Sequence, residues 1–322
     1  MNSIDKRSVS VGLLIQKLSP VFLLLILVLI FSLANERFFQ IANFVNILRQ
    51  TAILGVVAMG MTLVILTAGI DLSVGTMMAF SAAVMGAAVT RWGFNPFMAV
   101  TVGVLAGTAM GTLNGFIITK GGIQPFIATL GMMVAGRGLV LLITGAENIR
   151  GIPPSMLQGN LIIGGMRGVP FSAIVFALLA IATWTMLNKT TLGRNVMAIG
   201  GNAEASRTSG IRVDRTKIVV YGLSGFFCAV AGFLLMGRLN GVPPLMAEGQ
   251  ELQAITAVAL GGTSLAGGFG SIVGTVIGVL TIGVLVNGLH FMGVSAAWQQ
   301  VIMGSMIITV VVLDSWRRRK FD

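Results

Sequence analysis

Very few side chains in this sequence could perform covalent chemistry. The one histidine, His290, has no second type of metal ligand near it in the sequence, and the one cysteine, Cys228, lies in an apolar run typical of a buried small hydrophobic residue. No Gly-x-x-x-x-Gly-Lys-Ser/Thr phosphate loop occurs, and neither does a His-Glu-x-x-His or Gly-x-Ser-x-Gly motif. The sequence therefore predicts a protein that is not an enzyme, binds no metal or cofactor itself and does not hydrolyse ATP.

Polar groups inside the apolar runs are sparse. Arg137 is the clear basic residue within a run, and Asp71 lies between two runs. Asp71 could cap the helix that follows it, or it could be the counter-charge of Arg137, because an unpaired charge in a membrane is costly. Uncharged polar groups, which could contact a substrate or bond a neighbouring helix, are Asn114, Gln253, Thr256, Asn287 and Gln299. Ion-coupled carriers usually need ionisable groups at mid-membrane, so this scarcity favours another driving force.

The composition indicates that these groups lie in a membrane. Of the 322 residues 55% are hydrophobic, the mean hydropathy is +0.94, and only 10% are charged, against about 25% in soluble domains. The apolar runs are long and unbroken, which favours helices over the alternating strands of a barrel. The net charge of +11 sits mainly at the ends of these runs and carries no nucleic-acid motif. We therefore expect an all-α, polytopic transmembrane bundle.

Ten spans are predicted, since about 20 apolar residues cross the bilayer core. They are 18–34, 51–70, 72–90, 97–119, 125–144, 171–187, 218–236, 252–267, 272–289 and 296–313. The first span could instead be a signal peptide, but its apolar run is longer than the usual signal core. Glycines between 261 and 270 break the eighth span, and they either flank a transport pathway or simply end a helix. The many other glycines are expected to pack helices closely.

Charge predicts the orientation. With the N-terminus in the cytoplasm, 14 Lys and Arg residues lie inside and six outside, which agrees with the positive-inside rule and places both termini in the cytoplasm. We expect one transmembrane domain over 1–322, in which the most basic loop, 188–217, lies inside. The longest outer loop is 145–170.

The centre of the basic loop reads GGNAEASRTSGI, residues 200–211. Asn202 is a good N-cap, Glu204 suits the positive end of the helix dipole, and Gly210 can end a helix in the left-handed conformation. The segment predicts a helix of about two turns outside the membrane. A helix this short is not stable alone, so a contact should hold it. On these grounds it could also be an ordinary capped connector.

This segment resembles the Glu-Ala-Ala loop of permeases of ATP-binding cassette (ABC) importers. That pattern is Glu-Ala-Ala, three residues and Gly; here it is Glu204-Ala205-Ser206, three residues and Gly210, with serine in place of the third alanine. The resemblance implies a short helix that docks into a cleft of a separate ATPase subunit. The residues that it assigns to this coupling are Gly201, Asn202, Glu204, Ala205, Arg207 and Gly210.

Five further segments narrow the resemblance to permeases of ribose-type sugar importers. They are Asn46–Gln50, 60–75, 125–138 and 259–275, together with Asn287-Gly288-Leu289, so that the likeness covers roughly residues 38–315. It implies a multi-pass protein of the bacterial inner membrane that imports a monosaccharide by alternating access. The implied partners are an ATPase subunit that uses the ATP, a periplasmic sugar-binding protein, a second permease protomer and membrane lipid. The alternative is an ion-coupled secondary transporter of a small polar solute.

Overall fold

A computed structural model describes residues 20–157, 161–163 and 168–319. Several charges that entered the orientation argument, namely Lys6, Arg7, Lys17, Arg167 and Lys320, lie outside the described residues. The described chain is mostly helical, in agreement with the predicted fold class. A two-stranded antiparallel hairpin, with Ile162 opposite Pro170, is a small addition outside the helical bundle.

The elements follow one another with short connections. An unlabelled first helix, Pro20–Ala34, precedes η1 (Glu36–Phe39), α2 (Ile41–Leu66), α3 (Val74–Thr90), α4 (Pro96–Lys120), α5 (Pro125–Thr144), η2 (Pro154–Met156), β1 (Ile162–Ile163), β2 (Val169–Pro170), α6 (Phe171–Lys189), α7 (Thr191–Gly201), α8 (Ala203–Thr208), α9 (Val213–Leu239), α10 (Gln250–Leu260), α11 (Ile272–Phe291) and α12 (Ala296–Arg319).

Six of these helices, α2, α4, α5, α6, α9 and α11, are long and apolar enough to cross a membrane. The first helix, α3 and the apolar part of α12 are shorter apolar helices. The helix α10 has only 11 residues, which extend about 16 Å at 1.5 Å per residue. A helix over the whole predicted span 252–267 is therefore wrong, because the chain leaves the helical conformation at Gly261 and Gly262 has a φ of +86°.

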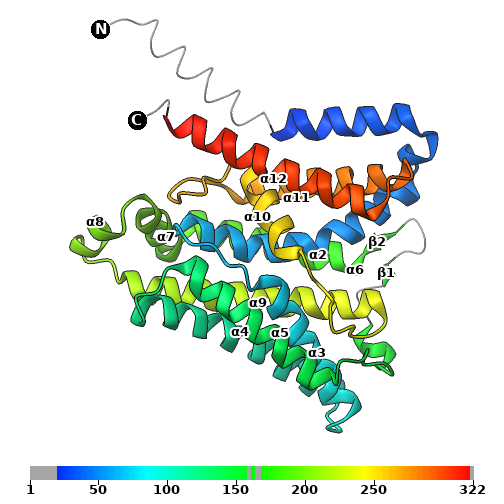
Figure 1. The fold of residues 1–322 in the computed structure, drawn as a ribbon, viewed down its shortest axis with the longest axis horizontal. Helices are drawn as coiled ribbons and strands as arrows, with labels where there is room; N and C mark the ends of the chain where they lie inside the picture. The colour runs from blue at the N-terminus through cyan, green and yellow to red at the C-terminus, as the bar shows by residue number, and fades with distance from the viewer. Residues whose placement is uncertain (1–19, 158–160, 164–167, 320–322) are drawn as a thin grey trace, which may run out of the picture.

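Named contacts divide the bundle into two ends. At one end, which we call the hairpin end, Asn43 on α2 meets Asn287 on α11, and the backbone of Ile149 pairs with that of Val242. At the other end, which we call the α8 end, Lys120 at the close of α4 meets Asp214 at the start of α9. Figure 1 shows α7 and α8 at the left, β1 and β2 at the right, and α2 running through the middle of the bundle.

Glycines bring α4 and α9 into backbone contact. The α4 glycines Gly103, Gly107, Gly111 and Gly115 recur every four residues and therefore share one face of the helix. A Cβ built on Gly111 would lie 2.9 Å from backbone atoms of Gly225 on α9. Small residues allow this approach in a membrane, where packing drives helix association. This confirms the packing role predicted for glycines of this kind.

Candidate functional site

The helix α8 begins as the sequence predicts. The Asn202 backbone is extended, with φ −160° and ψ 109°, and its side-chain Oδ1 accepts a hydrogen bond of 2.9 Å from the Ala205 amide. That bond satisfies one of the amides left free in the first helical turn. The predicted N-cap is confirmed, and Glu204 lies in the first turn.

The end of α8 also follows the prediction. Gly210 has a φ of +84°, its amide donates to the Arg207 carbonyl, and the Ile211 amide donates to the Ser206 carbonyl. These two bonds form a Schellman motif, which needs a left-handed residue where Gly210 stands. The predicted glycine stop is confirmed.

The helical segment itself differs from the prediction in its extent. Residues 203–208 alone form α8, whereas Gly200 and Gly201 are the last residues of a separate helix, α7, which the sequence analysis did not predict. Buried Val196 and Ile199 lie three residues apart on α7. This apolar spacing after Thr190, whose hydroxyl accepts from the Gly193 amide, is the signal that could have revealed the helix.

The tertiary structure holds α8 from one side. Ser206 is 5% exposed, and Arg207 forms an ion pair of 2.9 Å with Asp214, whose other oxygen lies 3.4 Å from Lys120. Both pairs are largely exposed, so each contributes little to stability and mainly orients the helix. Glu204 and Ala205 are exposed on the opposite side. The helix therefore offers a free face that a partner could contact.

The N-cap bond gives a testable prediction for α8. Replacing Asn202 by alanine should cost about 1 kcal/mol of local helix stability, because the Ala205 amide loses its acceptor. Hydrogen exchange at the first-turn amides should then be about fivefold faster, as that energy implies. Replacing Asn202 by aspartate keeps an acceptor oxygen and should leave exchange nearly unchanged. Equal exchange in all three proteins would contradict this role.

Backbone contacts join the α7–α8 unit to the core. Gly200 packs directly against the carbonyl of Leu66, the last residue of α2, and against the Gly268 amide. The same Gly268 amide donates to the Leu66 carbonyl at 3.1 Å. The glycine-rich segment after α10 therefore lies between the end of α2 and α7. It links the exposed helix to the buried bundle, a role that neither sequence interpretation of this glycine break had included.

A buried polar cluster occupies the turn between α2 and α3. The Ser73 amide and hydroxyl donate to Asp71 Oδ1 at 3.0 and 2.6 Å, and the Ser224 hydroxyl of α9 donates to Oδ2 at 3.1 Å. Asn114 of α4 donates to the Ser73 hydroxyl at 2.8 Å. All four side chains are fully buried. Asp71 therefore accepts from the amide of Ser73, which is the N-cap residue of α3, and from no first-turn amide within the described residues, so the predicted side-chain cap does not form. The cluster instead ties α3, α4 and α9 together.

Arg137 has a different partner from the one considered in the sequence analysis. Its guanidinium lies 3.7 Å from Glu248, just before α10. Within the described residues, the ion pair of Arg137 is with Glu248 and not with Asp71. The pair connects the middle of α5 with the entry to α10.

The other predicted polar residues separate into two kinds. Asn287 accepts from Asn43 at 3.0 Å, which is a helix–helix bond, whereas Thr256 and Gln299 bond backbone carbonyls of Leu252 and Val294. Gln253 instead lines a cavity between helices.

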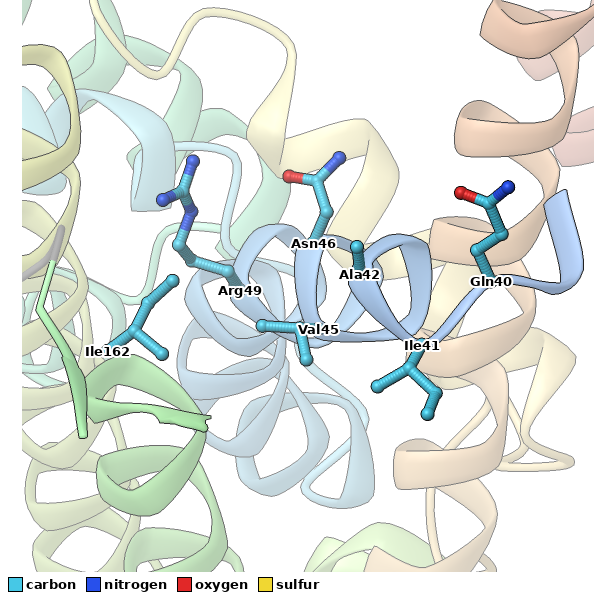
Figure 2. Close-up of a pocket in the computed structure, with 7 residues that line it drawn as sticks. All are labelled: Gln40, Ile41, Ala42, Val45, Asn46, Arg49 and Ile162. Carbon is cyan, nitrogen blue, oxygen red and sulfur yellow. The ribbon is translucent and has the colours of Figure 1, made fainter. Parts of the chain in front are cut away.

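A larger pocket, not predicted, opens at the hairpin end. It has a volume of about 600 Å³, and Figure 2 shows the residues that line it, which are Gln40, Ile41, Ala42, Val45, Asn46, Arg49 and Ile162. The polar ends of Gln40, Asn46 and Arg49 point to the same side of α2 in this view. Asn46 and Arg49 belong to a segment that the sequence analysis selected only because it resembles permeases of ribose-type sugar importers. That resemblance was the one sequence signal that pointed to residues of this pocket.

Long apolar helices around a buried polar turn, with an exposed and doubly capped helix at one end, define a multi-pass membrane protein. The sequence family described as the permease component of the branched-chain amino acid transport system matches residues 43–311, and the chain belongs to that family.

Three relatives match this chain over more than nine-tenths of their length. The ribose import permease protein RbsC of Bacillus subtilis (strain 168) is 46% identical over 299 residues, 93% of this chain and 92% of the relative. The RbsC protein of Escherichia coli (strain K12) is 44% identical over 294 residues, 91% of each chain. The D-allose transport system permease protein AlsC of the same strain is 37% identical over 312 residues, 96% and 95% of the two chains. No solved structure matches the chain.

Proposed function

We propose that this chain is the permease subunit of an ATP-driven importer of a monosaccharide in the bacterial inner membrane. The exposed helix α8, fixed at both ends and connected through Gly200 to the end of α2, is the structural observation that carries the proposal. The relatives, whose names specify ribose and allose, support a sugar as the solute.

The proposed partners follow from this arrangement. A separate ATPase subunit docks on the free face of α8, with Gly201, Asn202, Glu204, Ala205, Arg207 and Gly210 as the coupling residues, and supplies the ATP hydrolysis. A periplasmic sugar-binding protein docks at the hairpin end, over 35–50, 145–170 and 237–251; part of the second range lies outside the described residues. Two permease protomers work together. The backbone pairing of Ile149 with Val242 supports a common outer surface for the last two ranges.

The proposed orientation places the α8 end in the cytoplasm. Lys189, Arg194, Arg212, Arg215 and Lys217 lie at or near this end, in and beside the α7–α8 unit, as the positive-inside rule requires. The six long apolar helices give six passes, and the first helix, α3 and α12 give three more. If α10 and the segment after it together form one further pass, the total is ten, which agrees with this orientation. Both termini are then cytoplasmic.

The proposed mechanism is alternating access. ATP binding closes the ATPase dimer and displaces α8, and α7 transmits the displacement to the end of α2 and to the glycine segment after α10 through Gly200. Because α10 is joined to α5 by Arg137 and Glu248, its displacement changes the contacts of both helices. The two states must differ in their contacts with sugar or partners for ATP to drive the cycle.

A single substitution tests the coupling. Gly210→Pro requires a φ near −65° where the chain has +84°, and it removes the amide that bonds Arg207. We expect ATP-driven sugar uptake in proteoliposomes to fall by at least about tenfold, equivalent to ~1.4 kcal/mol of lost coupling, and the ATPase subunit to dissociate during purification.

The matched control is Gly293→Pro, at an exposed turn with a φ of +72° and an amide that bonds His290, far from α8. It should retain the ATPase subunit. Normal uptake by Gly210→Pro with its ATPase bound would refute the docking role of α8. Uptake by the wild-type protein that persists without any ATPase and collapses with an uncoupler would instead identify an ion-coupled carrier.

A further inference from the structure

A polar pocket lies at the α8 end of the bundle, between the start of α7, the loop that follows α8 and the start of α9. Its volume is about 450 Å³, which falls within the range of roughly 300–1,000 Å³ that small-molecule sites have. Of the proposed coupling residues only Gly210 lines the pocket, so it is separate from the free face of α8 that Glu204 and Ala205 form. The pocket therefore has room for a ligand besides the ATPase subunit.

Two arginines make this pocket positively charged. Arg212 is the N-cap residue of α9 and Arg215 lies in its first turn, and both side chains are exposed. Within the described residues neither guanidinium forms an ion pair, because Asp214, which lies between them in the sequence, is engaged by Arg207 and Lys120. No carboxylate lines the pocket in that part of the chain. The pocket therefore offers two guanidinium groups to an anion.

Neutral polar groups of α7 complete the charged part of the lining. Thr191 and Asn195 are four residues apart and therefore share one face of α7. A guanidinium presents its N–H groups as a planar fork that binds phosphate oxygens bidentately, and hydroxyl and amide groups add further donors. This set of donors matches the several acceptor oxygens of a phosphate group.

An apolar residue extends the pocket toward the membrane span. Arg212, Arg215, Thr216 and Val219 follow the spacing of one helix face on α9. Val219 is apolar and 41% exposed, and it lies farther along a helix that is long and apolar enough to cross a membrane. Cations at the helix end and hydrocarbon beyond them match a phospholipid, whose phosphate lies at the bilayer surface and whose chains extend inward. A free phosphate ion has no part that would contact Val219.

We propose that this pocket binds the phosphate headgroup of an anionic phospholipid, with Arg212 and Arg215 as the charged contacts. Basic pockets beside transmembrane helices recognise anionic headgroups on the cytoplasmic side, which is where the proposed orientation places this end of the bundle. The inference goes beyond the proposed function, since it requires a membrane protein but no particular solute. The bound lipid holds the loop 209–211, and with it the end of α8, at the membrane surface.

Fluorescence quenching by brominated lipids tests the site without requiring transport. Val219→Cys is introduced into the full-length permease and labelled with bimane, and the native Cys228 gives a low background because it is fully buried. The protein, alone and in complex with its ATPase subunit, is placed in phosphatidylcholine nanodiscs. These contain either brominated phosphatidylglycerol or brominated phosphatidylcholine at equal mole fraction. Bromine quenches only a fluorophore that it approaches closely, so the ratio of the two quenching constants measures lipid preference at the pocket.

Brominated phosphatidylglycerol should quench more strongly than brominated phosphatidylcholine. A Lys or Arg near an anionic lipid surface favours binding about fivefold, so Arg212→Gln and Arg215→Gln should each lower the preference about fivefold. Lysine at both positions should retain most of the preference, because the charge remains. The matched control is Lys189→Gln combined with Arg194→Gln. It removes two exposed charges near the same end from residues that do not line the pocket, and it should leave the preference unchanged.

Three results would overturn the proposal. Equal quenching by the two lipids, or an equal loss of preference in the control and in the arginine variants, would show that the pocket does not select an anionic lipid. Millimolar sodium phosphate that removes the preference at constant ionic strength would identify a site for free phosphate. A preference that is present in the permease alone but absent from the complex would identify a surface that the ATPase subunit covers. Because every readout is lipid contact, ATP-dependent sugar uptake decides the proposed function separately.

Discussion

Replacing Gly111 by leucine is expected to prevent stable folding of the bundle. The atoms nearest to a Cβ at this position belong to the backbone of Tyr221 and Gly225 on α9, which cannot rotate away as a side chain can. Overpacking against side chains costs about 1–3 kcal/mol, and a clash between two helix backbones should exceed that range. The substituted protein should lose its monodisperse peak in size-exclusion chromatography after detergent extraction, and it should be digested by low concentrations of protease.

Gly131→Leu is the matched control for this experiment. Gly131 lies within the apolar helix α5, is exposed, and has no atom within 4 Å of a built Cβ. This variant adds the same side chain to the same kind of membrane helix, and its monomer should fold with a melting temperature near that of the wild type. If both variants fold equally well, the contact between α4 and α9 does not limit stability.

The second large effect is expected at Asp71. Replacement by alanine removes the acceptor of three hydrogen bonds and leaves the Ser73 amide, the Ser73 hydroxyl and the Ser224 hydroxyl buried without that partner. Each unsatisfied buried donor costs about 1–3 kcal/mol, so the free energy of unfolding should fall by roughly 3 kcal/mol or more. Thermal unfolding in detergent, followed by intrinsic fluorescence, should show a markedly lower midpoint.

Two smaller substitutions separate the contributions that individual hydrogen bonds of Asp71 make to the free energy of unfolding. Ser224→Ala removes only the 3.1 Å bond between α9 and Asp71, and it should cost about 1 kcal/mol. Asp71→Asn keeps an oxygen for Ser73 and can donate to Ser224, so it should be milder than alanine. A melting midpoint of Asp71→Ala equal to that of Ser224→Ala would contradict the role of Asp71 at the start of α3.

The losses of stability expected for Gly111→Leu and Asp71→Ala concern two different contacts within the same group of helices. The α4–α9 contact and the Asp71 cluster hold α2, α3, α4 and α9 as a rigid group, whereas α7, α8 and the segment after α10 meet α2 only at its end, near Leu66. A displacement of α8 therefore reaches this group at the end of α2, through α7, and at the start of α9, through the ion pair of Arg207 with Asp214. A rigid central group of helices, connected to the separate short helices α7 and α8, is suited to a protein that changes conformation without losing its fold.

Local chemistry explains what could be predicted from the sequence. The N-cap Asn202 and the stop at Gly210 depend on hydrogen bonds between residues at most five positions apart, so the sequence alone is enough to place them. Composition likewise determines the helical membrane class, because lipid leaves unbroken apolar runs no other way to satisfy their backbone. The helix α7 was missed because its short pattern follows directly on the apolar span of α6.

The partners of the polar residues were decided by the tertiary structure alone. Asp71 meets Ser224, 153 positions away, and Arg137 meets Glu248 on a distant segment. Helices that are apolar almost all round carry no periodic signal of which face turns inward, so the sequence could not bring these groups together. The same reason hides the cavity around Gln253, whose lining comes from four helices. The sequence by itself determined that the chain is a helical membrane protein with a short helix capped at both ends, and only packing decided which buried polar groups meet.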